Sequence, residues 1–256
     1  MIGDPISQVQ APRLLNGVFA ELGTPAVLVP VHIPADSLNS ILPGMLRIAN
    51  LDGVLVTVPH KAAVCGHADR VSATVDVAGS ANALRREPDG AWYAENFDGT
   101  GFVGGLAAAG HSARGDDVTL VGAGGAGSGI AAALLGAGAA RIRVFDVHRA
   151  RLHRLINRLE THWPGRAVGT GRPDLTTADL AINATPLGLH PHDPLPFDPR
   201  ELPPGALVAD IVMDPHETAL LSTAAASGRR IHHGRHMLQH QLAAYRAFFG
   251  LDETGG

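Results

Sequence analysis

The sequence predicts an α/β protein with a mixed α/β region over residues 1–100 and a parallel sheet covered by helices over 101–234. Three observations support this prediction. Apolar runs rich in β-branched residues recur along the chain, segments with helical spacing separate them, and turns containing Gly or Pro lie between. Strands that alternate with helices pair in parallel, because each helix carries the chain back across the sheet.

The first region combines strands, helices and one antiparallel hairpin. The expected elements are a strand at 26–33, a helix at 36–50, a strand at 53–58, a short helix at 72–79, and hairpin strands at 81–86 and 91–95. Asp36 or Ser37 is a suitable N-cap for the first of these helices. Pro59 ends the second strand, and Pro88-Asp89-Gly90 is a turn signature between the hairpin strands.

The second region alternates strands and helices more regularly. The expected elements are a helix at 101–109, a strand at 117–121, a helix ending near 135, a strand at 141–145, a helix at 149–159, and strands at 178–183 and 207–212. An amphipathic stretch at 237–249 follows. It lies in the C-terminal segment 235–256, which we expect to pack back on the first region.

Composition excludes several classes of protein. Of the 256 residues 45% are hydrophobic and the net charge is −4, so the chain is not intrinsically disordered. It has no basic run for a nucleic acid and no apolar run long enough to span a membrane. The N-terminus does not have the pattern of a secretory signal. The single cysteine, Cys65, cannot form an internal disulfide, which favours the reducing cytoplasm. We expect a small-molecule partner and a monomer or homodimer.

A glycine-rich turn follows the strand at 117–121 and matches G-x-G-x-x-G. The turn comprises Gly122, Ala123, Gly124, Gly125, Ala126 and Gly127. Such glycines allow a tight turn and let backbone N–H groups approach a pyrophosphate at a helix N-terminus. Asp146 ends the next strand, 19 residues after Gly127, where a dinucleotide-binding fold places its ribose ligand. The pattern predicts a Rossmann-type dinucleotide-binding domain, and the alternative is a packing turn without a ligand.

Asp146 also bears on the choice of cofactor. A carboxylate accepts hydrogen bonds from both ribose hydroxyls but repels a 2′-phosphate. The sequence therefore favours NAD, while the nearby Arg149 and Arg151 leave NADP possible.

One lysine, Lys61, stands among 20 basic residues. Arginine does not release its proton near neutral pH, whereas lysine can, so a lone lysine in such a chain is a candidate for proton transfer. It follows a strand end. Asp98 lies downstream, in front of a predicted helix. A lysine beside a carboxylate is a pair that a dehydrogenase can use to move a proton while hydride moves to or from nicotinamide.

Eight collinear segments resemble the shikimate/quinate dehydrogenase family, over nearly the whole chain. The matching segments are Gly3–Ile6 (GDPI), Thr57–Lys61 (TVPHK), Gly79–Leu84 (GSANAL), Asn96–Phe102 (NFDGTGF), Gly122–Ala126 (GAGGA), Asn183–Gly188 (NATPLG), Asp210–Thr218 and Gly234–Gln241. The resemblance implies an N-terminal substrate-binding domain, a Rossmann domain, and hydride transfer between NAD(P) and a ring hydroxyl of shikimate, quinate or a related cyclic polyol carboxylate. Members of this family serve aromatic amino acid biosynthesis.

The resemblance also implies roles for individual residues. Lys61 and Asp98 would be the catalytic pair, Lys61 taking the hydroxyl proton and Asp98 holding the ammonium group. Thr57, Asn82 and Gln241 would bind substrate hydroxyls. The residues expected to line the dinucleotide site beyond the glycine turn are Asn183, Ala184, Thr185, Ile211 and Gly234.

The chain departs from the family where a substrate carboxylate would bind. Val9 and Ala11 stand at the positions of two serines, Leu55 replaces an asparagine, and Met213 replaces a tyrosine. Hydrogen bonds to a charged group contribute about 1.5–3 kcal/mol each. Either Ser7, Gln8 or Gln10 supplies substitute donors, or the substrate differs at that end.

Two further interpretations remain open. His232, His233, His236 and His240 lie close in sequence, but no H-E-x-x-H motif or cysteine partner accompanies them, so we expect no metal and expect His236 to line the nicotinamide pocket. The alternative function is a nucleotide-binding regulatory or redox-sensing protein that keeps the fold without turnover.

Overall fold

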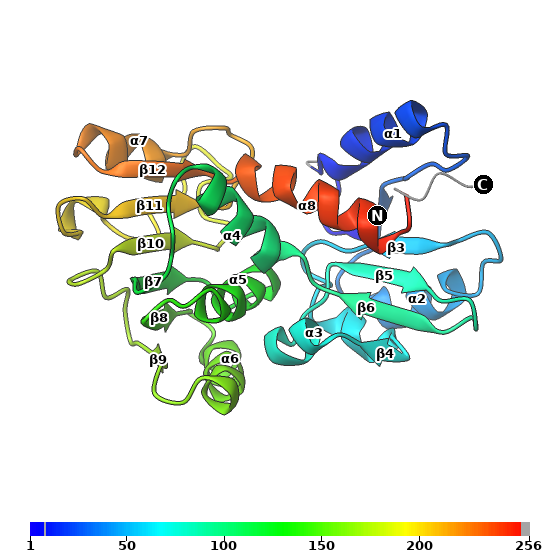
Figure 1. Ribbon diagram of the computed structural model, residues 1–256, viewed down its shortest axis with the longest axis horizontal. Coiled ribbons are helices and arrows are strands. Elements are labelled where there is room, and N and C mark those ends of the chain that lie inside the picture. The colour runs from blue at the N-terminus through cyan, green and yellow to red at the C-terminus, as the bar shows by residue number, and fades with distance from the viewer. Residues whose placement is uncertain (8, 252–256) are drawn as a thin grey trace. The chain divides into compact units, whose positions relative to one another are not determined.

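The computed structural model describes residues 1–7 and 9–251 (Figure 1). The chain divides into two compact units. Unit 1 contains Met1–Phe97 and the C-terminal part from Gln241 onward, and unit 2 contains Asp98–His240. The divisions fall at 97/98 and 240/241, where the sequence predicts 100/101 and 234/235.

Unit 1 contains two small sheets. A two-stranded parallel sheet pairs β1 (Ile2–Gly3) with β2 (Val31–His32), and a four-stranded sheet has the order β3-β5-β6-β4. The strands of the second sheet are β3 (Gly53–Leu55), β4 (Arg70–Val71), β5 (Ala83–Arg86) and β6 (Trp92–Glu95). The helices of this unit are α1 (Ala11–Leu22), α2 (Leu38–Met45), the 3₁₀ helix η1 (Ala63–His67), α3 (Ala73–Ala78) and the second half of α8 (Arg235–Phe248).

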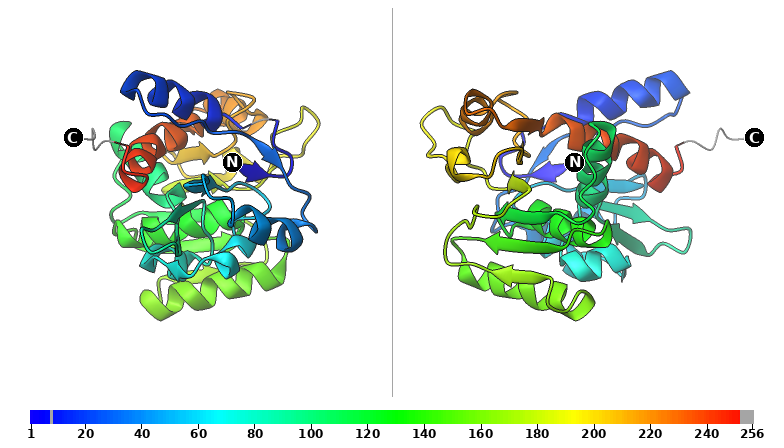
Figure 2. Two further views of the ribbon diagram at one scale, coloured as in Figure 1. Left: turned by 90° about the vertical axis from the view of Figure 1, so that its right-hand side faces the viewer. Right: turned by 60° about the vertical axis from the view of Figure 1, so that its left-hand side comes forward.

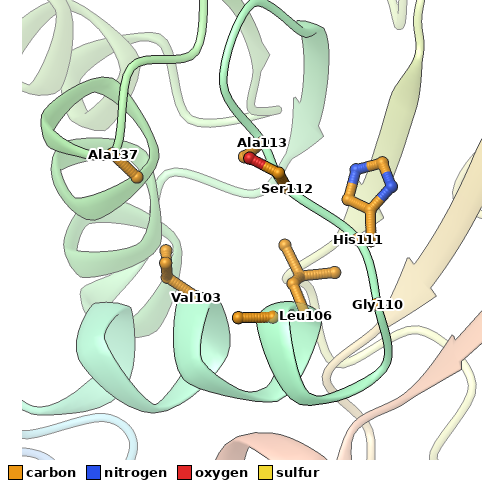
Figure 3. Close-up of a pocket in the computed structure, with 8 residues that line it drawn as sticks. Val103, Leu106, Gly110, His111, Ser112, Ala113 and Ala137 are labelled. Atoms are coloured by element: carbon orange, nitrogen blue, oxygen red, sulfur yellow. The ribbon is translucent and has the colours of Figure 1, made fainter.

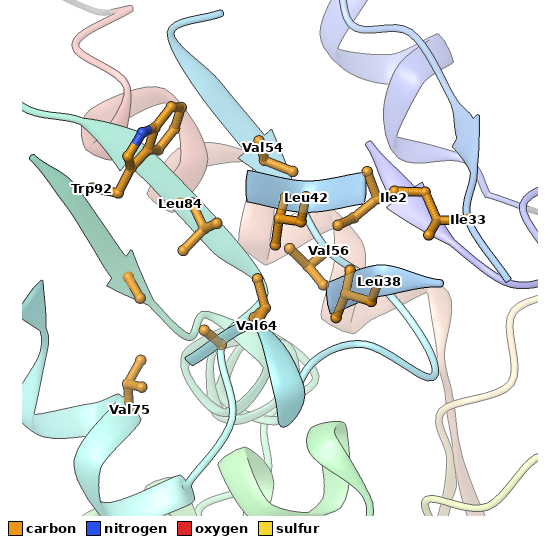
Figure 4. Close-up of a cluster of buried hydrophobic side chains, with 12 residues drawn as sticks. Ile2, Ile33, Leu38, Leu42, Val54, Val56, Val64, Val75, Leu84 and Trp92 are labelled. Atoms are coloured by element: carbon orange, nitrogen blue, oxygen red, sulfur yellow. The ribbon is translucent and has the colours of Figure 1, made fainter. Parts of the chain in front are cut away.

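The core of unit 1 is aliphatic with one tryptophan. Buried side chains from both sheets and from α2 meet in one cluster, shown in Figure 4. Ile2, Leu42 and Leu84 are each fully buried in it. Because this cluster joins β1 to β3 and β5, it fixes the chain on either side of the carboxyl end of β3.

The structure corrects two predictions for unit 1 and adds one helix. The expected strand at 26–33 is reduced to Val31–His32, because Asn16 binds both the N–H and the C=O of Leu28, at 2.7 and 3.0 Å. Helix α1 was not predicted, although Pro12 lies in its first turn, where proline is well tolerated. The expected helix at 36–50 is confirmed only over α2. The hairpin is confirmed as β5 and β6.

Unit 2 is built on a six-stranded parallel sheet of order β12-β11-β10-β7-β8-β9 (Figure 1). Its strands are β7 (Asp117–Val121), β8 (Arg141–Phe145), β9 (Ala167–Gly169), β10 (Leu180–Asn183), β11 (Leu207–Asp210) and β12 (Arg230–His233). In chain order this is 3-2-1-4-5-6, the order of dinucleotide-binding sheets. The order reverses between β7 and β10, so ligands of such folds bind at the carboxyl ends of these two strands. The predicted parallel sheet is confirmed.

The helices of unit 2 pack on the strands of the sheet, and some of them also pack on each other. They are α4 (Asp98–Ala108), α5 (Gly125–Gly136), α6 (Arg149–His162), α7 (Ala219–Ala226) and the first half of α8, together with the 3₁₀ helix η2 (Pro199–Glu201). Helix α5 packs on α4, β7 and β8, and α6 packs on β8 and β9 (Figure 2). The sequence did not predict β9, β12 or α7. Within residues 1–7 and 9–251, no helix is long and apolar enough to cross a membrane.

Candidate dinucleotide and substrate sites

The glycine turn between β7 and α5 has a backbone that only glycines allow. Gly122 has φ of +109°, and a Cβ there would lie 2.6 Å from the carbonyl oxygen of Ala184. A Cβ at Gly127 would lie 2.0 Å from the carbonyl oxygen of Gly122. These two glycines therefore let the turn close on itself and on the end of β10.

Gly124 differs from its neighbours, because nothing lies within 4 Å of the position that its Cβ would take. It is the N-cap of α5 with extended backbone, and no side chain caps the helix there. The partial positive charge of the helix N-terminus suits a pyrophosphate. The open space over Gly124 thus fits the dinucleotide that the sequence predicts.

Asp146 lies at the carboxyl end of β8, beside the glycine turn. Its Oδ2 accepts a hydrogen bond from the N–H of Ala123 at 2.7 Å, and its Oδ1 accepts one from the N–H of His148 at 2.6 Å. Both bonds hold the carboxylate in one orientation. The side chain remains half-exposed, so its other lone pairs can accept from ribose hydroxyls.

A polar network holds the loop that follows β10. Asn183 donates to the carbonyl of Leu187 at 2.9 Å and to Asp210 Oδ1 at 3.0 Å, and its own oxygen accepts from the N–H and hydroxyl of Thr185. Burial raises the pKa of Asp210, although hydrogen bonds from Val212, Thr218 and Asn183 oppose this rise. The network fixes Ala184 and Thr185 beside Gly122, at the crevice where the strand order reverses.

Gly234 follows β12 and lies against the carboxyl end of the neighbouring strand β11. A Cβ there would lie 2.6 Å from the carbonyl carbon of Ile211, so β12 can approach the end of β11 only with glycine at this position. The loop residues Ile211 and Gly234 therefore lie next to each other.

In unit 1, Thr57, Lys61 and Asn82 gather where β3 ends and β5 begins. The strands are antiparallel, with Leu55 opposite Ala83. The N–H of Ala81 donates to the carbonyl of Lys61 at 2.7 Å, and the N–H of Val56 donates to the carbonyl of Asn82 at 2.8 Å. The register of this pair thus carries the lysine and the amide to one end of the sheet.

Burial differs among these three residues. Lys61 is 9% exposed and Asn82 is 2% exposed, while Thr57 is half-buried. The Asn82 side chain accepts from the N–H of Phe97 at 3.0 Å, and Asn96 donates to the hydroxyl and carbonyl of Ser80. These bonds fix the chain just before Asp98.

Asp98 is the first residue of α4 and is 2% exposed. The next residue, Gly99, lies against α5, where a Cβ would be 2.3 Å from the carbonyl oxygen of Gly129. Glycine at this position brings the first turn of α4 onto α5 and so fixes the carboxylate within unit 2. Lys61 and Asp98 belong to different units, and their pairing is a proposal.

Gln241 lies in α8 and is 3% exposed. Its Oε1 accepts from the hydroxyl of Tyr245 one turn later at 3.2 Å, and Tyr245 packs edge-to-face on Phe97. Sequence reasoning missed Tyr245 as the residue that orients Gln241. The signal was their i, i+4 spacing on one helix face. Of the other predicted contacts, Gln10 is exposed, and Gln8 lies outside the described residues.

A histidine cluster lies beside α4 in unit 2. The ring of His232 stacks near that of His236 at 5.0 Å and meets Phe102 edge-to-face at 5.9 Å. Across residues 1–7 and 9–251, no group of three or more His, Cys, Asp or Glu side chains has a geometry that could hold a metal ion. His232 is 3% exposed, and its Nε2 finds no hydrogen-bond partner among the described residues.

This burial predicts an acid-labile unit 2. Burial, together with the charges of neighbouring histidines, lowers the pKa of His232 from 6.5 to about 4. Between pH 6.5 and 4 the folded state therefore binds fewer protons than the unfolded state. The free energy of unfolding falls as the pH drops through this range, by roughly 3 kcal/mol at most. Urea unfolding of the wild type and of His232→Gln between pH 6.5 and 4 tests this prediction. His192→Gln, at an exposed position, is the control. An equal loss of stability in His232→Gln would contradict the assignment.

An apolar cavity of about 260 Å³ also lies in unit 2, between the C-terminal ends of α4 and α5 (Figure 3). Val103, Leu106 and Ala137 line it, and His111 stands at its edge. None of the predicted site residues lines this cavity. We therefore assign it no part in the chemistry.

Known proteins resemble the chain over its whole length. Residues 1–84 match the family described as shikimate dehydrogenase substrate binding domain. The chain is 36% identical, over 100% of its length and 92% of the relative's, to the shikimate dehydrogenase (NADP(+)) of Rubrobacter xylanophilus.

Two solved structures resemble the fold. Quinate dehydrogenase from Corynebacterium glutamicum in complex with NAD has a TM-score of 0.81 at 28% identity and covers 97% of this chain and 92% of its own. The ligand-free 5-ketofructose reductase of Gluconobacter sp. strain CHM43 has a TM-score of 0.80 at 26% identity and covers 94% and 87%.

Proposed function

We propose that this chain, a member of the shikimate dehydrogenase family and an NAD(P)-dependent alcohol dehydrogenase, reversibly transfers hydride between the nicotinamide and a ring hydroxyl of shikimate, quinate or a related cyclic polyol carboxylate. The observation that carries the proposal is the coexistence of two sites in one chain. The glycine turn with Asp146 suits a dinucleotide, and Lys61 with Asn82 and Thr57 suits a substrate rich in hydroxyl groups.

The bound nicotinamide would accept or supply the hydride. In the oxidative direction Lys61 Nζ takes the proton of the substrate hydroxyl, and in reduction the ammonium group returns it to the developing alkoxide oxygen. Asp98 holds the ammonium and accepts from a neighbouring hydroxyl. Thr57, Asn82 and Gln241 hold the other hydroxyls, which fixes the reacting carbon.

Turnover assays test this function directly. Absorbance at 340 nm would be followed with shikimate and quinate and either NAD or NADP. The relatives bear the names of shikimate, quinate and 5-ketofructose enzymes, so these three substrates form the first panel, with NADH or NADPH as the hydride donor for 5-ketofructose. Tight dinucleotide binding without turnover of any polyol would instead favour the regulatory or redox-sensing alternative.

For the cofactor, we propose NAD in preference to NADP. The N–H of Ala123 in the glycine turn holds one carboxylate oxygen of Asp146, and the N–H of His148 holds the other. A 2′-phosphate at the ribose would bring two negative groups together. The Rubrobacter xylanophilus relative carries NADP(+) in its name, so this chain would differ from it in cofactor.

Replacing Asp146 with alanine is expected to relax the discrimination against NADP by about tenfold or more, because it removes the repelling charge. The ratio of kcat/KM for NAD to that for NADP measures the effect. Asp76→Ala, at an exposed helix position, is the matched control. An unchanged ratio in Asp146→Ala would mean that another residue contacts the ribose.

We further propose that the enzyme works in the cytoplasm as a monomer or homodimer, without a nucleic acid or membrane partner. The single cysteine and the lack of a basic run support this proposal.

A further inference from the structure

We propose that Tyr245 is a positioning residue of the substrate site, which raises the affinity for the substrate by holding the amide of Gln241 in one orientation. The inference deepens the proposed function and rests on it, because Gln241 is one of the residues assigned there to the substrate hydroxyls. It follows from contacts within unit 1, between the second half of α8 and the sheet β3-β5-β6-β4.

The second half of α8 carries one buried stripe. Gln241, Tyr245 and Phe248 follow one another at i, i+4 and i+7, and their exposed fractions are 3%, 5% and 9%. Two of the three are aromatic, whereas Gln241 carries an amide. Burying an amide costs free energy unless its groups are hydrogen-bonded. A glutamine at this position therefore indicates a role besides packing.

The last turn of α8 is fixed to the sheet of unit 1. A Cβ at Gly53, the first residue of β3, would lie 2.3 Å from Phe249 Cε1, so the ring of Phe249 lies directly on the backbone of this strand. Arg85 Cζ lies 4.6 Å from the centre of the Phe248 ring, and the Arg85 guanidinium donates to the carbonyl of Phe248. These contacts fix the position of the buried stripe along the sheet.

The hydroxyl of Tyr245 holds the amide of Gln241. It donates to Gln241 Oε1 at 3.2 Å, and both groups are buried. The last torsion of a glutamine side chain has a broad, roughly two-fold preference, so it does not by itself decide which end of the amide faces a ligand. The bond from Tyr245 selects the orientation in which the oxygen faces the tyrosine and the NH2 group faces away from it. Gln241 is thereby set as a hydrogen-bond donor towards the substrate.

The ring of Tyr245 supports the other amide assigned to the substrate. It packs edge-to-face on Phe97, with the ring centres 5.4 Å apart, and the N–H of Phe97 donates to Asn82 Oδ1 at 3.0 Å. The hydroxyl of Tyr245 thus acts on Gln241, and its ring acts on Asn82 through Phe97. A change that removes only the hydroxyl leaves the contact with Phe97 in place and so isolates the first of these effects.

Removing this hydroxyl tests the proposal. In Tyr245→Phe we expect KM for the member of the substrate panel that turns over best to rise about 3–10-fold, the effect of one hydrogen bond. We expect kcat to stay within about twofold and the dissociation constant of NADH to stay the same, because the bond bears on substrate binding. Tyr93→Phe is the matched control, since Tyr93 is the other tyrosine of the chain and packs on Phe248 in the same aromatic cluster.

A double-mutant cycle shows whether Tyr245 acts through Gln241. Gln241→Ala removes the amide, and adding Tyr245→Phe to it should then leave KM unchanged within about 1.5-fold. Gln241→Met repeats the cycle with a side chain of similar size, which leaves no cavity. An equal rise of KM with and without Gln241 would mean that the hydroxyl serves only the fold, and it would overturn the proposal. An unchanged KM in Tyr245→Phe would overturn it as well.

This inference and the dehydrogenase can fail separately. Equal kcat and KM in the wild type and in Tyr245→Phe overturn the positioning role and keep the dehydrogenase. No turnover of any member of the panel overturns the dehydrogenase, and the cycle is then measured on the dissociation constant of shikimate by titration calorimetry with the full chain. In that case an equal constant in the wild type and in Tyr245→Phe, or no binding of shikimate, overturns the positioning role too.

Discussion

Replacing Lys61 with alanine is expected to lower kcat by roughly 10²–10⁴-fold, as the loss of a general acid–base group typically does. Lys61 is the only lysine of the chain and is 9% exposed, so no neighbouring lysine can replace it. Its main-chain carbonyl accepts a hydrogen bond from the N–H of Ala81, a contact that the alanine variant keeps. The measurement is steady-state turnover together with the dissociation constant of NADH.

Two further variants separate charge from proton transfer. Lys61→Arg keeps the positive charge but cannot release a proton near neutral pH, so it should remain nearly as slow as Lys61→Ala. Arg70→Ala removes a cation paired with Asp89 at the surface and should leave turnover unchanged. NADH should bind all three variants with similar affinity. Wild-type activity in Lys61→Ala would remove the lysine from the reaction.

The second large effect is expected at the glycine turn, where two substitutions to alanine should fail in different ways. In Gly127→Ala the new methyl group would meet the carbonyl oxygen of Gly122 at 2.0 Å, and we expect a destabilisation of roughly 1–3 kcal/mol or more, with loss of NADH binding. In Gly124→Ala the methyl group enters open space, and the φ of −76° is allowed for alanine.

Gly124→Ala should therefore fold with a stability within about 0.5 kcal/mol of wild type. Its methyl group would nevertheless occupy the space that a pyrophosphate needs, and NADH should bind about tenfold or more weakly. Urea unfolding and fluorescence titration with NADH measure the two quantities. If Gly124→Ala bound NADH as wild type does, the turn would be a packing feature without a ligand.

Local sequence signals predicted the elements whose causes lie within a few residues. The glycine turn was predicted because a positive φ and a close approach both require glycine, as at Gly122. The strands β7 and β8 were predicted because each is a short segment rich in β-branched and apolar residues on either side of the glycine turn and its helix. The hairpin of β5 and β6 followed from Pro88-Asp89-Gly90.

Elements that depend on distant partners were missed or misplaced. The strand expected at 26–33 forms only at Val31–His32, because Asn16, 12 residues before Leu28, takes both backbone groups of Leu28. Strand β9 has only three residues, too few for a periodic pattern, and it is held by its pairing with β8. The burial of His232 also depends on a distant partner, because its ring packs on Phe102 in α4.

The sequence by itself determined the family, the parallel sheet and the residue types of both sites, because each depends on short motifs with fixed backbone requirements. Only the tertiary structure decided that Asp146 is anchored by the N–H of Ala123, that Gly124 faces open space, and that the segment after β1 pairs with Thr57. The physical reason is that hydrogen bonds and close contacts between segments far apart in the chain arise from the packing of sheets and helices. No local pattern specifies which of these distant groups will meet.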